Sequence, residues 1–166
     1  VGYGPGTDFF TASTSGALFG ELVAAAAEKL LRAGGRDPRE HTFVEIGAEP
    51  GGPGVLAGVS HAFGGSRVVR VGESHGLSGA CVVFSNELFD AQPCTRTVMR
   101  EGQWREIGVR LDGDALGETE FAPPCGAAAA PVEGAVPVPE GYHFDRPLAA
   151  TDLAAALAAE PWSGLF

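Results

Sequence analysis

The chain has 166 residues, a net charge of −10 and an apolar fraction of 45%, which is typical of one globular domain. The acidic balance argues against a general nucleic-acid binder, because such proteins need a basic face, and it suits basic partners instead. No apolar run reaches the roughly 20 residues that span a bilayer, so no membrane segment is expected.

The three cysteines are an odd number at wide spacing, without a CxxC pair. This pattern favours neither a zinc site nor a disulfide framework, and it is typical of a reduced, cytoplasmic protein. The four histidines are scattered without metal-ligand spacing, so no metal site is predicted.

The first predicted element is a helix over residues 17–33. The leucines at 18, 22 and 30 fall near one face of this helix, with Phe19, Val23 and Leu31 beside them. Ser15 is a candidate N-cap, and Gly34 and Gly35 end the helix. A strand is predicted at 42–47, with a short helix from about 55 to 63 packed behind it.

Two further strands are predicted at 67–71 and 80–85, and the second is apolar enough to be central and covered on both faces. Only eight residues separate them, whereas a helical crossover between parallel strands needs a dozen or more. Segments 96–100 and 104–111 then predict an antiparallel hairpin with one solvent-exposed face.

Residues 122–141 are rich in Ala, Gly and Pro and predict a flexible loop inside a single domain that takes up residues 1–166. A last helix is predicted from Thr151, as its N-cap, to Ala159, and residues 162–166 resemble the start of another strand. Such a sheet would keep an unpaired edge. We therefore expect either an excerpt of a longer protein or a chain that pairs with another, for example as a homo-oligomer.

The segment FVEIGAEPGG at 43–52 reads as a buried strand that enters a glycine-rich turn, which is how α/β proteins hold a nucleoside cofactor. Glu45 and Glu49 would repel a pyrophosphate, and Pro50 removes one N–H from the turn. The turn therefore favours a nucleoside with a cationic tail. S-adenosylmethionine, with its sulfonium and ammonium groups, fits that description.

Several segments together resemble one family. They are GTDFFTA at 6–12, LFGEL at 18–22, VEIGA at 44–48, NELFDAQP at 86–93 and WRE at 104–106. They resemble the signatures of the MidA-type methyltransferases, the family of the mitochondrial complex I assembly arginine methyltransferase. The segment at 86–93 is the most specific, because the family has NEFFDALP there; Leu88 and Gln92 depart from it. The resemblance covers most of residues 6–111.

The resemblance implies an α/β fold of the class I methyltransferase (Rossmann-like) kind. This is a doubly wound, mostly parallel sheet with an inserted antiparallel hairpin, here incomplete at the C-terminus. It also implies S-adenosylmethionine-dependent methylation of protein side chains, with an arginine-bearing protein as the partner. Glu87 and Asp90 are the candidate catalytic residues, meeting across a turn to hold a guanidinium. The candidate cofactor-binding residues are Asp8, Thr11, Glu45, Gly47, Ala48, Gly51, Glu73 and Asn86.

Alternatives stay open for these residues. Glu45 also reads as a solvated carboxylate, and Glu87 and Asp90 as acids in the first turn of a helix capped by Asn86. The family usually has a second glycine where this chain has Glu49 and Pro50. Together with the short spacer after residue 71, this supports a second hypothesis, a catalytically degenerate relative that acts as a binding or assembly module. A nucleotide-binding oxidoreductase is disfavoured because the turn lacks GxGxxG.

Overall fold

The computed structural model describes residues 17–48, 51–121 and 137–166. The chain divides into two compact units, of which the first comprises residues 1–90 and 155–166 and the second residues 91–154. No helix in the described ranges is long and apolar enough to cross a membrane.

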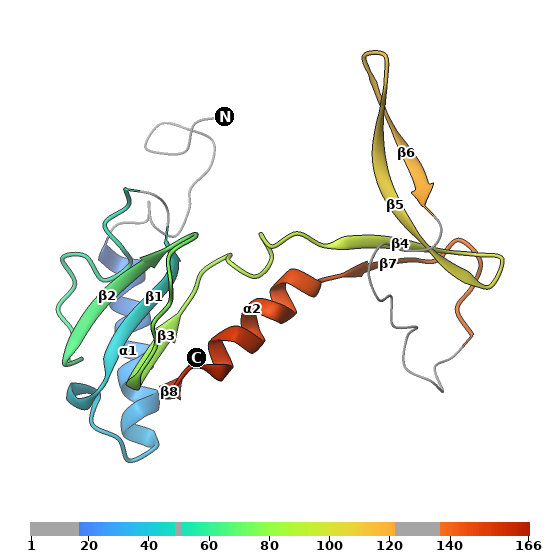
Figure 1. The fold of residues 1–166 in the computed structure, drawn as a ribbon. Coiled ribbons are helices and arrows are strands. Elements are labelled where there is room, and N and C mark those ends of the chain that lie inside the picture. The colour runs from blue at the N-terminus through green and yellow to red at the C-terminus, as the bar shows by residue number, and fades with distance from the viewer. Residues whose placement is uncertain (1–16, 49–50, 122–136) are drawn as a thin grey trace. The chain divides into compact units, whose positions relative to one another are not determined.

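The first unit contains a parallel sheet with the strand order β2-β1-β3-β8 (Figure 1). Its strands are β1 (Thr42–Ala48), β2 (Gly65–Arg70), β3 (Gly79–Phe84) and β8 (Trp162–Leu165). All four strands predicted for this part of the chain are therefore present, with ends shifted by one or two residues. The central place predicted for β3 is also confirmed, since it lies between β1 and β8.

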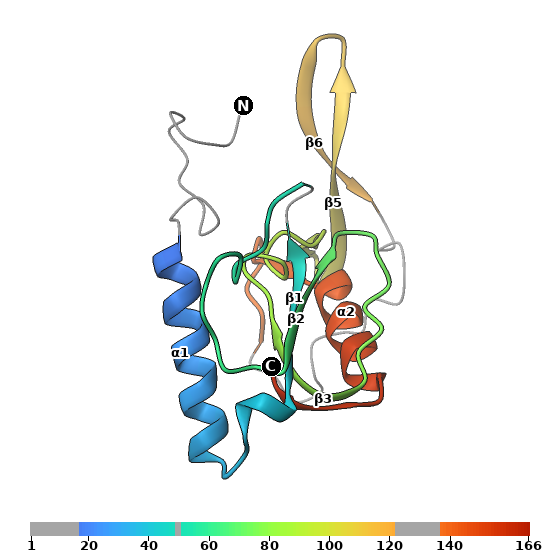
Figure 2. The ribbon, with the colours of Figure 1, turned by 90° about the vertical axis from the view of Figure 1, so that its left-hand side faces the viewer.

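Helix α1 (Ala17–Ala33) has the predicted bounds and packs against one face of this sheet (Figure 2). It ends as the two glycines predict, because Gly35 takes a positive φ of 71° and the N–H of Arg36 reaches back to the carbonyl of Leu31. The core between helix and sheet contains Leu31, Phe43 and Val82, among others.

The apolar face predicted for α1 is wrong in its leucine stripe, whereas Leu31 and Val23, predicted beside that stripe, do reach the core. Leu18, Leu22 and Leu30 are 60–65% exposed, and the helix buries Gly20, Ala24, Ala27 and Leu31 instead. The reason is close approach: a Cβ on Gly20 would lie 2.0 Å from the carbonyl oxygen of Val55. Small residues on this face therefore bring the axis of α1 close to the segment around Val55. A face of leucines would keep the helix further away.

The helix predicted from about 55 to 63 is also wrong. Residues 55–58 form a hydrogen-bonded turn and the remainder is irregular, although Leu56, Val59 and Phe63 enter the core as expected. Two side chains from outside the segment accept its backbone N–H groups. Glu45 accepts the N–H of Val55, and Glu28 accepts that of Ala62.

The connection from β2 to β3 contains no helix. Eight extended residues reach about 26 Å, which is enough to return along a six-residue strand of about 20 Å. The return segment is held by Arg67, whose guanidinium donates to the carbonyls of His75 and Gly76, and by the buried side chain of Leu77. A parallel crossover is thus made with fewer residues than a helical one requires.

The second unit contains an antiparallel sheet with the order β6-β5-β4-β7. The predicted hairpin is its centre, with β4 (Thr95–Arg100) and β5 (Gln103–Asp112) joined through Glu101 and Gly102. Sequence patterns do not predict the other two strands, β6 (Ala115–Phe121) and β7 (His143–Arg146). Strand β7 is fastened by Arg96, which binds Asp145 through two hydrogen bonds of 2.8 and 2.9 Å and holds the pKa of Asp145 below its ordinary value.

Helix α2 (Leu148–Ala159) begins three residues before its predicted start. Thr151 is therefore not the N-cap but lies inside the helix, where its hydroxyl donates to the carbonyl of Pro147. The loop predicted at 122–141 falls largely on residues 122–136, which lie outside the described residues, as does Ser15. The predicted α/β fold class is confirmed, with a full antiparallel sheet in place of a hairpin alone.

Replacement of Gly20 by alanine tests the close approach of α1. In an open helix this change stabilises by about 0.5–1 kcal/mol. Here the added methyl group meets backbone at Val55, so we expect a loss of about 1–3 kcal/mol in the free energy of unfolding. Denaturant unfolding measures it. Gly34→Ala, where the nearest atoms are 3.4 Å or more away, is the matched control, and a Gly20→Ala protein at least as stable as wild type would contradict the packing.

Candidate functional site

The parallel sheet brings three predicted site segments to one edge. Residues after β1, β2 and β3 all follow the carboxyl ends of parallel neighbours, so the glycine turn, Glu73 and Asn86 share this edge. From β1 the chain runs to β2, on one side of β1 in the sheet, and from β2 it crosses back to β3, on the other side of β1. The gap between β1 and β3 is therefore a topological switch point. Open α/β sheets bind ligands at such points.

Gly47 opens the glycine turn as a bulge at the end of β1. The register with β2 skips this residue, because Ile46 pairs with Val69 and Ala48 with Arg70. Gly47 takes a positive φ of 81°, and a Cβ there would lie 2.7 Å from Cδ1 of Leu88. Glycine is therefore required twice, by the backbone conformation and by the side chain that follows β3.

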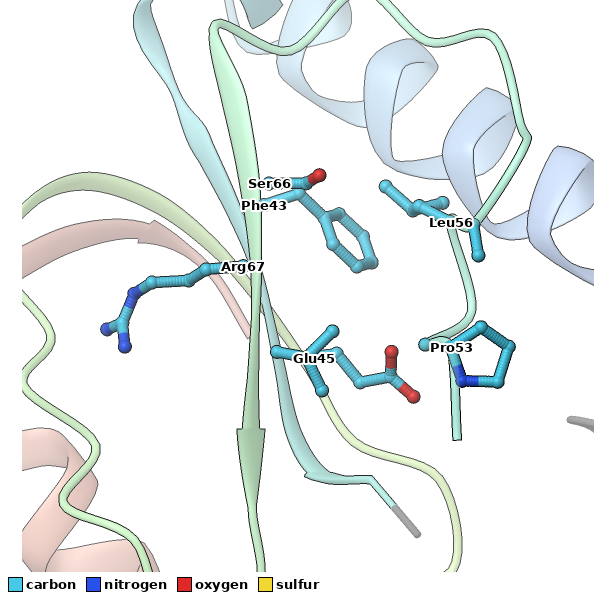
Figure 3. Close-up of a pocket in the computed structure, with 9 residues that line it drawn as sticks. Phe43, Glu45, Pro53, Leu56, Ser66 and Arg67 are labelled. Carbon is cyan, nitrogen blue, oxygen red and sulfur yellow. The ribbon is translucent and has the colours of Figure 1, made fainter. Parts of the chain in front are cut away.

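The far end of the turn is fixed by Glu45. Its Oε2 accepts a 2.6 Å hydrogen bond from the N–H of Val55, ten residues further along the chain. Figure 3 shows the carboxylate directed away from the strand toward Pro53, beside the ring of Phe43. Glu45 is thus neither an exposed, solvated carboxylate nor a free ligand. It closes the loop that runs from β1 to Val55.

A cavity of about 90 Å³ lies under this closed loop, lined by Phe43, Glu45, Leu56 and Val68, among others. Arg67 also lines it, although its guanidinium extends to the other side of the strand in Figure 3. Pockets that hold cofactor-sized ligands have volumes of roughly 300–1,000 Å³. This cavity is therefore a packing feature beneath the loop, and the strand ends remain the candidate site.

Arg70 joins the glycine loop to the residues after β2. Its guanidinium donates to the carbonyl of Gly52 at 2.9 Å, and its own N–H donates to Oε2 of Glu73 at 2.8 Å. The carboxylate of Glu73, a candidate cofactor-binding residue, is thereby turned back to the end of its own strand. One residue thus fixes both the loop position and the acid.

The segment after β3 carries two unpaired carboxylates. Glu87 and Asp90 are exposed, within residues 86–91 that form bends and a turn rather than the first turn of a helix. Neither acid has a hydrogen bond or ion pair with another described residue. Glu87 also has a positive φ of 51°, which is rare outside glycine and costs on the order of 1–3 kcal/mol. The strained backbone at Glu87, beside two exposed carboxylates, favours a binding role for this turn.

The structure therefore brings together most of the predicted cofactor residues. Glu45, Gly47, Ala48, Gly51, Glu73 and Asn86 belong to the three segments at this edge, with Glu45 and Ala48 in β1 itself. Asp8 and Thr11 lie outside the described residues. Sequence reasoning missed three contributors, Val55, Arg70 and the role of Leu88, because each acts through a contact distant in the chain. In the described parts of the chain no group of His, Cys, Asp and Glu is arranged to hold a metal ion.

Comparison with known proteins gives one family and one fold. Residues 66–160, more than half of the chain, match the model of a family described as "Putative S-adenosyl-L-methionine-dependent methyltransferase". No curated protein matches. A crystal structure from Burkholderia thailandensis with bound S-adenosyl-homocysteine superposes with a TM-score of 0.65 at 22% identity over 94% of this chain. A native structure of a protein of the same superfamily and organism gives 0.65 at 23% over 93%. The chain spans about half the length of these solved structures, 47% and 48%.

The closing hydrogen bond of the glycine loop is testable by two variants of one residue. Glu45→Ala leaves the N–H of Val55 without its acceptor, and we expect a loss of about 1–3 kcal/mol in the free energy of unfolding. Glu45→Gln retains an acceptor oxygen of nearly the same shape and should lose clearly less. Chemical unfolding followed by circular dichroism compares them, and equal losses in both variants would show that the contact does not close the loop.

Proposed function

Because this chain belongs to the family of S-adenosyl-L-methionine-dependent methyltransferases that its residues 66–160 match, we propose that it transfers methyl groups to protein side chains. The cofactor predicted from the glycine turn is confirmed by this family assignment. The related Burkholderia structure holds S-adenosyl-homocysteine, the product of that cofactor after methyl transfer. One observation carries the proposal. The glycine turn, Glu73 and Asn86–Asp90 all follow the carboxyl ends of neighbouring strands in the parallel sheet.

The residues at this edge suit S-adenosylmethionine. The open backbone at Gly51, where a Cβ would meet nothing within 4 Å, leaves room for a ligand beside the turn. Glu73 and Asn86 offer oxygen atoms to ribose hydroxyls and to an ammonium group, and a carboxylate favours a nearby cation. When bound, this cofactor supplies an electrophilic methyl group on a sulfonium. Gly47 and Gly51 would line its approach, with the loop kept in place by Glu45 and Arg70.

The acceptor side of the proposal rests on Glu87 and Asp90. Both are exposed and have no ionic partner in the described chain, so a cationic side chain would find two carboxylates in one turn. A guanidinium matches carboxylates through parallel hydrogen bonds, which fixes the orientation of its nitrogen. Such positioning supplies most of the rate in transfer between two bound groups. We therefore propose arginine as the methylated residue and a MidA-type relationship, as NELFDAQP at 86–93 suggests.

A second function is favoured by two observations at the same site. The connection at 71–78 contains no helix, and Leu88 packs against Gly47, which the cofactor would approach. A chain of this kind would keep the fold and act as a binding or assembly module. Loss of turnover with retained cofactor binding is its signature.

Methyl transfer itself tests the proposal. The whole chain is incubated with S-adenosylmethionine and a peptide of repeated Arg-Gly units, and mass spectrometry measures the addition of methyl groups. We expect transfer by wild type and a loss of at least about 100-fold in Glu87→Gln, since orientation effects of this size are common. Cofactor affinity, measured by calorimetry, should stay within about threefold in this variant. Binding without transfer in wild type would instead favour the binding module.

A further inference from the structure

The second unit presents a two-stranded ribbon. Strand β5 pairs with β4 only over residues 103–106 and with β6 over residues 106–112. Beyond residue 106 the two strands β5 and β6 continue as a ribbon past the end of β4, as Figure 1 shows. A two-stranded ribbon is marginally stable in water by itself. Within the described chain, β6 is also an edge strand, whose outer backbone groups are open to pairing.

One face of this ribbon is apolar and exposed. Val109, Leu111 and Leu116 are 70%, 67% and 76% exposed. Leu111 and Leu116 are directly opposite in the register, and Val109 is two residues along the same face, so the three side chains adjoin. Apolar side chains gathered at an open strand edge mark a contact surface rather than scattered surface residues.

Acidic side chains border the apolar cluster on the same face. Glu118 is opposite Val109, and Glu120 is opposite Ile107. Arg100 binds Glu120 at 2.9 Å, whereas Glu118 is exposed and has no hydrogen bond or ion pair with a described residue. Residues 103–121 as a whole carry five carboxylates and two guanidinium groups. The open edge therefore combines apolar contact with a net negative charge, in which Arg100 pairs with Glu120 and Arg96 attracts Glu118 at longer range.

This charge pattern disfavours a second copy of the chain as the occupant. Two β6 strands in antiparallel pairing would place Glu118 and Glu120 of both copies on one shared face. Like charges across a strand pair destabilise it, whereas opposite charges contribute about 0.2–1 kcal/mol for each pair. Pairing with a cationic strand is therefore stabilised by the same side chains that destabilise pairing with a second copy.

We propose that the ribbon binds an extended, cationic segment of another protein by strand addition along β6. Alternate residues of that segment lie on the exposed face, with an apolar side chain against Leu111 and Leu116 and arginine or lysine beside Glu118 and Glu120. Backbone hydrogen bonds supply affinity, and the alternating side chains supply specificity. The interaction requires no methyl transfer, so its failure and the failure of the proposed function are separate outcomes.

A labelled peptide tests this proposal with the whole chain. The probe is fluorescein-labelled Thr-Leu-Thr-Arg-Thr-Arg-Thr, in which leucine and both arginines share one face of a strand. Fluorescence anisotropy should show saturable binding. The same peptide with glutamate in place of arginine should bind at least about fivefold more weakly, from two cross-strand charge pairs lost and reversed.

Two variants with the same charge change localise the contact. Glu118→Lys should weaken binding of the arginine peptide about five- to tenfold and strengthen binding of the glutamate peptide. Asp112→Lys changes the opposite face of the ribbon, since Asp112 pairs with Ala115, and should stay within about twofold of wild type. Circular dichroism of both variants shows that the fold is kept.

Three outcomes would overturn the proposal. The first is absence of saturable binding at peptide concentrations up to about 1 mM, the weak limit of specific affinity. The second is an equal loss in Glu118→Lys and Asp112→Lys, which would indicate attraction by net charge alone. The third is a dimer in sedimentation velocity that Leu116→Ser converts to monomer, because the ribbon would then be covered by a second copy.

Discussion

The hydrogen bond between Oε2 of Glu45 and the N–H of Val55 is the contact on which the first unit depends. It begins in the central β1 strand and ends where the chain turns back toward the core, so it fixes both ends of the glycine loop. The loop then meets Arg70 from β2 and Leu88 from the segment after β3. Contacts from three neighbouring strands, or from the segments that follow them, thus hold one loop. Residues 51–55, held by these contacts, can present their backbone to a ligand at a lower cost of ordering.

The same contact explains which elements the sequence could predict. The β1 and β3 strands and α1 follow from local apolar patterns and glycine stops, and each is present with ends close to those predicted. The helix at 55–63 fails where Glu28 takes the N–H of Ala62, which a helix would direct to the carbonyl of Gly58, while Glu45 holds the N–H of Val55 from outside the segment. That information is in no local window, since the partners are 10 and 34 residues apart.

The buried face of α1 fails for a related reason. Periodicity identifies Leu18, Leu22 and Leu30 as an apolar stripe. Which face is buried depends, however, on how closely the helix can approach its neighbours, and the absence of a side chain at Gly20 allows it to touch Val55. The site divides in the same way. Residue types such as Glu45, Gly47 and Glu73 can be chosen from the strand-and-turn pattern, whereas Arg70 carries no motif and is found only by its contacts.

Charge connects the two units in chemical terms. The candidate site ends in Glu87 and Asp90, and the ribbon carries Glu118 and Glu120 beside exposed leucines. Both would attract cationic protein segments, the first a single side chain and the second an extended strand.

Hydrogen–deuterium exchange with S-adenosyl-homocysteine tests the central claim, that the cofactor binds at the strand ends around the closed loop. At a saturating concentration of this compound, we expect slower exchange of amides in residues 51–58, 71–76 and 86–91, and unchanged exchange in the ribbon at 107–118. Saturable binding in calorimetry without protection of residues 51–58 would contradict it.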